Sequence, residues 1–118
     1  MKFPSEQEQG FILQYIVLPL LLTVLERDKK IILNTPLKIK APYLSLFDFT
    51  IKTVEQSVHH NRKTLRLHGI KVYSQKRTEK GIEVRYLYHG YQHLFQPSWD
   101  TLRMRVSEMM ERIWSNLP

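Results

Sequence analysis

Cysteine is absent from this chain of 118 residues. Its absence excludes a disulfide framework, a thiolate-bound zinc site and chemistry with a cysteine nucleophile. We also expect no secretory signal, because Glu6 and Glu8 stand where such a signal carries basic residues. A chain without cysteine fits a reducing compartment, and we therefore expect a cytoplasmic protein.

Signatures of catalysis are also missing. The chain has four glycines, and they are not clustered into a phosphate-binding loop. It contains neither a Gly-x-Ser-x-Gly elbow nor a His-Glu-x-x-His pair. His89 and His93 lie four residues apart, but Gly90 between them argues against the helix that would place both on one face. We predict no enzyme, no cofactor and no metal site.

The chain has little that could span a membrane. Its longest apolar stretch is residues 11–25, which Gln14, Pro19 and Thr23 interrupt. As a helix this stretch would be about 22 Å long, less than the roughly 30 Å of a hydrocarbon core. Charged residues flank it on both sides. We interpret it as a buried core helix and predict no stable membrane span.

What is present indicates one domain, residues 1–118, with an α+β fold of three main helices and a small antiparallel sheet. Hydrophobic residues make up 42% and charged residues 25%, as in ordinary globular proteins. The first helix is expected from about residue 5 to about residue 30. Ser5 and Glu8 have the spacing of a capping box, and Pro19 should kink or divide the helix.

This first helix is apolar nearly all round. Such a helix must be buried on several sides, which is hard to achieve within one small chain. We therefore expect a homodimer whose interface includes Phe11, Tyr15, Leu18 and Leu22.

The second long helix is expected from residue 42 or 45 to residue 67. Ser45 is its predicted N-cap, and Leu44 and Phe49 would form a hydrophobic staple across that cap. Gly69 is suited to end it. Before it, the alternation of lysine with leucine and isoleucine over residues 37–40 predicts a short strand.

A β-hairpin is predicted from residues 70–75 and 82–88, with a turn over residues 76–81 in which Gly81 could take a positive φ. Residues 91–95 could add a third strand. Tyr86 and Tyr88 alternate with polar residues and should face the core, whereas Tyr73 and Tyr91 could stack on bases. The last helix should follow Pro97, with Ser98 as its N-cap.

Positive charge is concentrated in the middle of the chain. The net charge is +7, and residues 52–105 carry eleven Lys or Arg against four Asp or Glu, which is +7 by itself. A local excess of this kind is typical of a surface that binds a polyanion. It is also compatible with a surface that is only solvated.

The order of a helix followed by a basic hairpin is like that of a winged helix, in which a helix enters the major groove and the hairpin contacts the flanking backbone. We therefore predict a nucleic-acid-binding regulator, with DNA preferred to RNA. The predicted base contacts are His59, His60 and Asn61, near which the second helix would have to break. The predicted phosphate contacts are Arg62, Lys63, Arg66, Lys71, Lys76, Arg77, Lys80 and Arg85.

Two other functions are compatible with the sequence. One is a protein-interaction adaptor that docks through its apolar first helix and has no role with nucleic acid. The other is a membrane-surface protein, which an apolar helix and a basic patch together would suit.

Overall fold

The computed structural model describes residues 2–117 and confirms the predicted α+β fold. Its three helices and three strands follow the order helix, helix, three strands, helix. They are α1 (Glu6–Leu33), α2 (Ala41–Leu67), β1 (Ile70–Arg77), β2 (Ile82–Tyr88), β3 (Tyr91–Phe95) and α3 (Trp99–Ser115).

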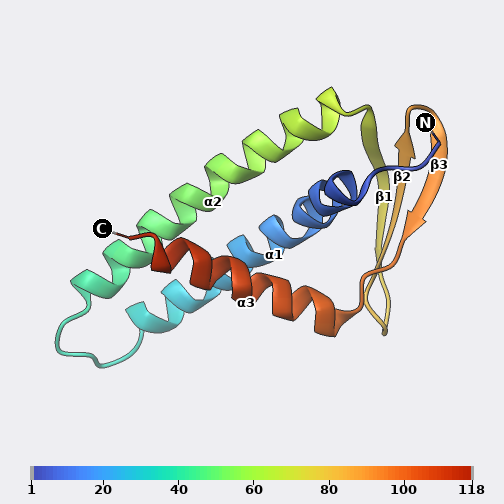
Figure 1. Ribbon diagram of the computed structural model, residues 1–118. Helices are drawn as coiled ribbons and strands as arrows, with labels where there is room; N and C mark the ends of the chain where they lie inside the picture. Colours follow the sequence, from blue (N-terminus) through green and yellow to red (C-terminus); the bar gives the residue numbers. More distant parts are fainter. Residues whose placement is uncertain (1, 118) are drawn as a thin grey trace.

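The molecule is long and narrow, with principal extents of 56 × 33 × 20 Å. Helices α1 and α2 run in opposite directions and are joined at one end by the loop 34–40, and α3 packs along them. The sheet closes the other end, where α1 begins and α2 ends (Figure 1). One face of the sheet therefore meets the helices and the other faces solvent.

Helix α1 begins as its sequence predicts. The Ser5 hydroxyl accepts from the Glu8 backbone N–H at 3.1 Å, and the Glu8 carboxylate accepts from the Ser5 N–H at 2.9 Å. Pro19 does not divide the helix, which continues through it to Leu33. Proline removes one backbone hydrogen bond, but the burial of apolar residues on both sides of it holds the helix together.

Helix α1 lies in the core of the molecule, so the side chains predicted for a dimer interface pack largely within one chain. Leu18 is buried, and Phe11, Tyr15 and Leu22 pack against buried residues of the same chain. Residues of the sheet, α2 and α3 share the core clusters with α1, so much of this apolar helix is covered within one chain. A homodimer stays a prediction, although these four side chains pack wholly or partly against the interior of their own chain.

The same burial bears on a membrane span. By length and composition alone, α1 is a candidate to cross a membrane. However, most apolar residues between Phe11 and Leu25 lie in the interior of the described chain, and Ile12, Ile16, Val17, Leu21 and Leu25 are each at most 2% exposed. Helix α1 is therefore best described as the core helix of a soluble domain.

Helix α2 is unbroken from Ala41 to Leu67. It begins earlier than the Ser45 cap predicts, because Pro42 fits the first turn, where the missing N–H costs nothing. The staple between Leu44 and Phe49 is therefore also wrong. The strand expected at residues 37–40 does not form, since α1 runs on to Leu33 and the rest is loop. In this loop, the Lys40 ammonium donates to the Leu33 carbonyl at 2.9 Å.

The sheet has the order β1–β2–β3 and is antiparallel. Tyr86 and Tyr88 face the core at 5% and 3% exposure, as predicted. Residues 91–95 form the third strand, after a turn in which His89 and Gly90 both have positive φ. Gly69 also has a positive φ of 69°, which suits its role in ending α2.

Helix α3 begins at its predicted cap. The Ser98 hydroxyl accepts from the Thr101 N–H at 3.1 Å. At the other end, the Trp114 indole N–H donates to the Thr50 hydroxyl of α2 at 2.8 Å. The helix is therefore held near both of its ends.

Candidate nucleic-acid interface

The first predicted group of cations lies on the last turns of α2. Asn61 and Leu65 point inward, at 4% exposure each. Arg62 and Arg66, which are also four residues apart, therefore share an outward face, and Lys63 is exposed beside them. The spacing of four residues therefore places Asn61 and Leu65 on the buried face of α2 and Arg62 and Arg66 on its exposed face.

The second group belongs to the sheet, and a β-bulge divides it. Pairing runs Lys71 with Leu87 and Val72 with Tyr86, but beyond the bulge Ser74 pairs with Arg85. Residues directly opposite each other share a face. Lys71, Lys76 and Arg85 therefore lie on the solvent face.

The bulge has a consequence that simple alternation does not predict. The extra residue moves Gln75 and Arg77 to the helix-facing side, opposite the buried Val84 and Ile82. Without the bulge, strict alternation from the core-facing Ile70 and Val72 would place Gln75 on the solvent face. Arg77 thereby comes near α1 instead of pointing away from the helices.

Two adjoining hollows connect the two groups of cations. One, of about 190 Å³, is lined by Arg62 of α2, and the other, of about 280 Å³, is lined by Lys76 and Arg77 of β1. Pro19 of α1 and Gln75 of β1 line both of them. We call the two together the Pro19 groove. Its remaining lining residues are Tyr15, Ile16, Leu18, Leu20, Thr23, Val58, Asn61 and Ile82.

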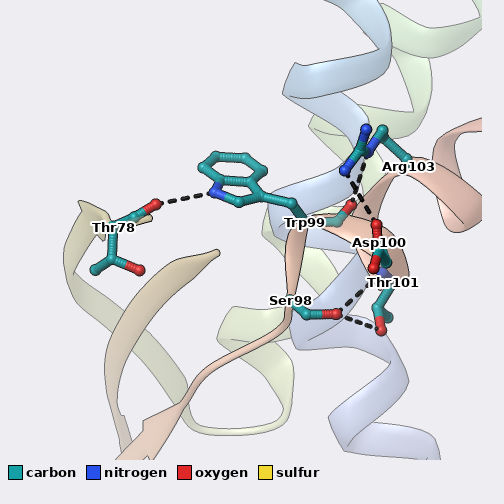
Figure 2. Close-up of polar contacts among 6 residues, drawn as sticks. All are labelled: Thr78, Ser98, Trp99, Asp100, Thr101 and Arg103. Atoms are coloured by element: carbon teal, nitrogen blue, oxygen red, sulfur yellow. Dashed lines mark hydrogen bonds and ion pairs between the residues drawn. The ribbon is translucent and has the colours of Figure 1, made fainter. Parts of the chain in front are cut away.

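The hairpin tip is not a free wing. Figure 2 shows the Trp99 indole N–H donating to the Thr78 carbonyl, at 2.9 Å. The Trp99 backbone N–H also donates to the Lys80 carbonyl at 3.0 Å. The Arg77 guanidinium carbon lies 5.6 Å from the centre of the Trp99 ring. These contacts fix the tip to the start of α3, so Arg77 is held in place while the side chain of Lys80 stays exposed.

Gly81 is needed at this tip for a reason that differs from the prediction. Its φ is not positive. Instead it is buried, and a Cβ built on it would lie 2.0 Å from the Pro97 carbonyl oxygen. The close approach of two backbone segments therefore requires glycine here.

Asn61 is a corrected prediction among the base contacts. Its amide donates to the Phe11 carbonyl at 3.0 Å and is buried against α1. It cannot read a base without leaving the core. His59 and His60 are exposed on α2. Because α2 does not break near Asn61, the two short helices of a helix-turn-helix are not formed, and the winged-helix comparison is not confirmed.

The eight predicted phosphate contacts share one electrostatic property. Within residues 2–117 there are three ion pairs of Lys or Arg with a carboxylate, Lys29–Asp48, Arg103–Asp100 and Arg105–Glu108, and one contact of His68 with Glu8. None of them includes any of the eight cations. Glu83, which lies opposite Lys76, accepts from the Gln96 amide at 3.2 Å instead. All eight are exposed, and none of them forms an ion pair within residues 2–117.

The comparisons with known proteins identify a family. The YhjD protein family matches residues 3–118. This chain belongs to the YhjD family. It is 28% identical over 109 residues to YhjD of Bacillus subtilis strain 168, and the similarity covers 91% of each chain. No solved structure matches it.

This YhjD-family chain also contains a polar cluster that its sequence does not reveal. The buried Glu8 carboxylate accepts from the Tyr88 hydroxyl at 3.0 Å and lies 2.9 Å from His68 Nδ1. These residues are 60 and 80 positions away from Glu8 in the chain. The sequence pointed to Glu8 only through the capping box, which accounts for its bonds to Ser5 but not for those to His68 and Tyr88.

The surroundings of Glu8 favour its charged form. The Ser5 backbone N–H, together with the bonds from His68 and Tyr88, lowers the pKa of Glu8 to about 2, although burial opposes this. Burial raises the pKa of Tyr88, and the bond to the Glu8 carboxylate adds to the effect. Within residues 2–117, no group of three His, Asp or Glu is placed to hold a metal ion. The cluster therefore reads as a polar contact that joins α1, α2 and β2.

Proposed function

We propose that this YhjD-family chain is a nucleic-acid-binding regulator that contacts backbone phosphates at the Pro19 groove and along the adjoining solvent face of the sheet. DNA is the preferred partner, and the location is the cytoplasm. The observation that carries the proposal is that eight exposed cations, on the end of α2 and on the hairpin, form no ion pair within residues 2–117, whereas Lys29, Arg103 and Arg105 do.

Uncompensated cations on a fixed surface are suited to a polyanion. A cation that is already paired must first give up its carboxylate, whereas an unpaired one exchanges water and counterions for phosphate. Arg62 from α2 and Lys76 and Arg77 from β1 line connected hollows, so one strand of phosphates could contact both groups. Lys71 and Arg85 extend the same charge over the face of the sheet.

The form of the contact differs from a winged helix. The last turns of α2 lie beside the edge strand β1, so the surface combines a helix end with a strand edge. Exposed Tyr73 lies at the bulge of that strand and is placed to stack on an unpaired base. Binding to single-stranded nucleic acid is therefore tested together with binding to duplex DNA.

The test is binding of the full chain to mixed-sequence duplex DNA and to single-stranded DNA and RNA across a salt series. The variant is Arg62→Gln/Lys76→Gln, which removes one cation from the end of α2 and one from the solvent face of β1, both at the lining of the Pro19 groove. We expect weaker binding and a salt slope that is lower by about 0.9 for each lost duplex contact, or about 0.7 for a single strand.

The matched control is Arg103→Gln/Arg105→Gln. It removes the same total charge from α3, where both arginines are paired with carboxylates. The control should keep the slope of the wild type. If both variants weaken binding equally, or if wild-type binding vanishes at moderate salt, the charge acts as a general surface property and the proposal is overturned.

A further inference from the structure

The end of the molecule opposite the sheet presents a second surface with different chemistry (Figure 1). It consists of the end of α1, the loop 34–40 and the start of α2, and we call residues 29–47 the helical tip. Five large apolar side chains of the helical tip are markedly exposed. They are Ile31 at 56%, Leu33 at 48%, Leu37 at 38%, Ile39 at 67% and Tyr43 at 51%.

The charges of the helical tip all have one sign. Residues 29–47 contain Lys29, Lys30, Lys38 and Lys40 and no Asp or Glu. Lys29 pairs with Asp48, and Lys40 donates to the Leu33 carbonyl. Lys30 and Lys38 are exposed and form no ion pair within residues 2–117. Exposed apolar groups are thus interleaved with free cations.

From these two features we infer that the helical tip docks on an anionic phospholipid surface. Exposed apolar side chains at the convex end of a narrow molecule are readily covered by a soft medium, whereas a folded partner would need a matching cavity. Lysines beside them complement anionic headgroups, and tyrosine is suited to the interfacial zone.

The geometry makes this a contact and not a span. The apolar residues gather in the last turn of α1, the loop and the first turn of α2, while the rest of α1 is occupied by the core. Insertion would therefore reach the boundary between headgroups and acyl chains, and binding would be reversible. The sheet and the Pro19 groove would then lie away from the membrane, so this inference does not depend on the proposed function.

The first experiment is co-sedimentation of the full chain with phosphatidylcholine vesicles, with and without phosphatidylserine. We expect binding to the phosphatidylserine vesicles alone. Leu37→Ser/Ile39→Ser should lower the partition coefficient by roughly tenfold or more, because two exposed apolar groups no longer insert. Lys30→Gln/Lys38→Gln should lower it by about tenfold.

Two controls separate the helical tip from the rest of the surface. Leu94→Ser removes an apolar side chain that is 46% exposed on the sheet, and Lys76→Gln/Lys80→Gln removes two cations at the hairpin. Both should bind vesicles as the wild type does. If Lys76→Gln/Lys80→Gln loses as much binding as Lys30→Gln/Lys38→Gln, the attraction is a property of net charge and the inference is overturned.

The second experiment uses the absence of cysteine. In Ile39→Cys, the introduced thiol takes an environment-sensitive dye at one place, and Leu94→Cys provides the matched control. Anionic vesicles should shift the emission of the dye at residue 39 to the blue and leave that at residue 94 unchanged. An equal response at both positions would overturn the inference. So would a shift at residue 39 that depends on protein concentration without lipid, because a second copy of the chain would then be the occupant.

Discussion

At the scale of the residue, Gly81 shows how a position can be correctly identified as special for the wrong reason. The sequence placed it in a turn that could need a positive φ. The structure places it where the hairpin tip meets the chain before α3, with no room for a side chain. Which backbone segment approaches it depends on residues 97–98, which no local pattern around the hairpin could indicate.

Replacement of Gly81 tests this contact. A Cβ would meet the Pro97 carbonyl, which is backbone and cannot swing away, so we expect Gly81→Ala to lower the free energy of unfolding by about 1–3 kcal/mol. Urea denaturation measures the change. The matched control is Gly10→Ala in α1, where a Cβ has no neighbour within 4 Å. That change should stabilise the chain by about 0.5–1 kcal/mol, and a Gly81→Ala variant as stable as Gly10→Ala would contradict the close approach.

At the scale of the element, the helices follow their sequence signals most closely where the signals are local. The capping box of α1, the Ser98 cap of α3 and the positive φ of Gly69 all occur as expected. The sequence left the start of α2 open between residues 42 and 45, because a proline in the first turn and a serine cap three residues later are competing start signals. Such a competition is decided by small energy differences that tertiary packing easily exceeds.

Each of the two tryptophans of α3 makes a hydrogen bond to another part of the chain. Trp99 donates to the Thr78 carbonyl near one end, and Trp114 donates to the buried Thr50 hydroxyl near the other. We expect Trp114→Phe to cost about 1 kcal/mol and to speed amide exchange in the last two turns of α3. Hydrogen exchange measured residue by residue provides the check. Trp99→Phe should instead loosen the hairpin tip, and identical exchange patterns in the two variants would show that neither indole positions its own end.

At the scale of the whole molecule, Glu8 joins parts of the chain that are far apart in sequence. Its carboxylate contacts the end of α2 through His68 and the sheet through Tyr88. The pKa of Glu8 is lowered from 4.5 to about 2 in the folded chain. A lowered carboxyl pKa means that the stabilisation is complete above the unfolded value and disappears as the pH falls through the folded value.

This gives a prediction for stability against pH. Between about pH 4.5 and pH 2 the wild type should lose the contribution of Glu8. The free energy of unfolding of Glu8→Gln should be lower than that of the wild type by about 1–3 kcal/mol at neutral pH. This difference between the two proteins should decrease as the pH falls from about 4.5 to about 2. Thermal denaturation at several pH values measures it. Glu6→Gln, at an exposed position of the same helical turn, should keep the acid response of the wild type, and a constant gap for Glu8→Gln would contradict the account.

The candidate interface shows the same division between local and global information. The sequence alone indicated that the eight candidate cations would be exposed, because burial of a lysine or arginine is costly. It did not reveal that Arg62 and Arg77 line connected hollows, since a β-bulge turned Arg77 toward α1 and only packing brought α2 beside β1. The sequence also could not show that Asn61 is buried while His59 and His60 are exposed, because Asn61 donates to the Phe11 carbonyl, which is 50 residues away in the chain.

By itself, the sequence determined the fold class, the N-caps of α1 and α3, the hairpin and the concentration of positive charge. These depend on periodicity, on hydrogen bonds within a few residues and on the cost of burying charge. Tertiary structure alone decided that α1 is covered within one chain, that α2 continues past Asn61 and that the hairpin tip is fixed to α3. Each of these follows from contacts between residues far apart in the chain, whose energies exceed the local preferences that compete with them.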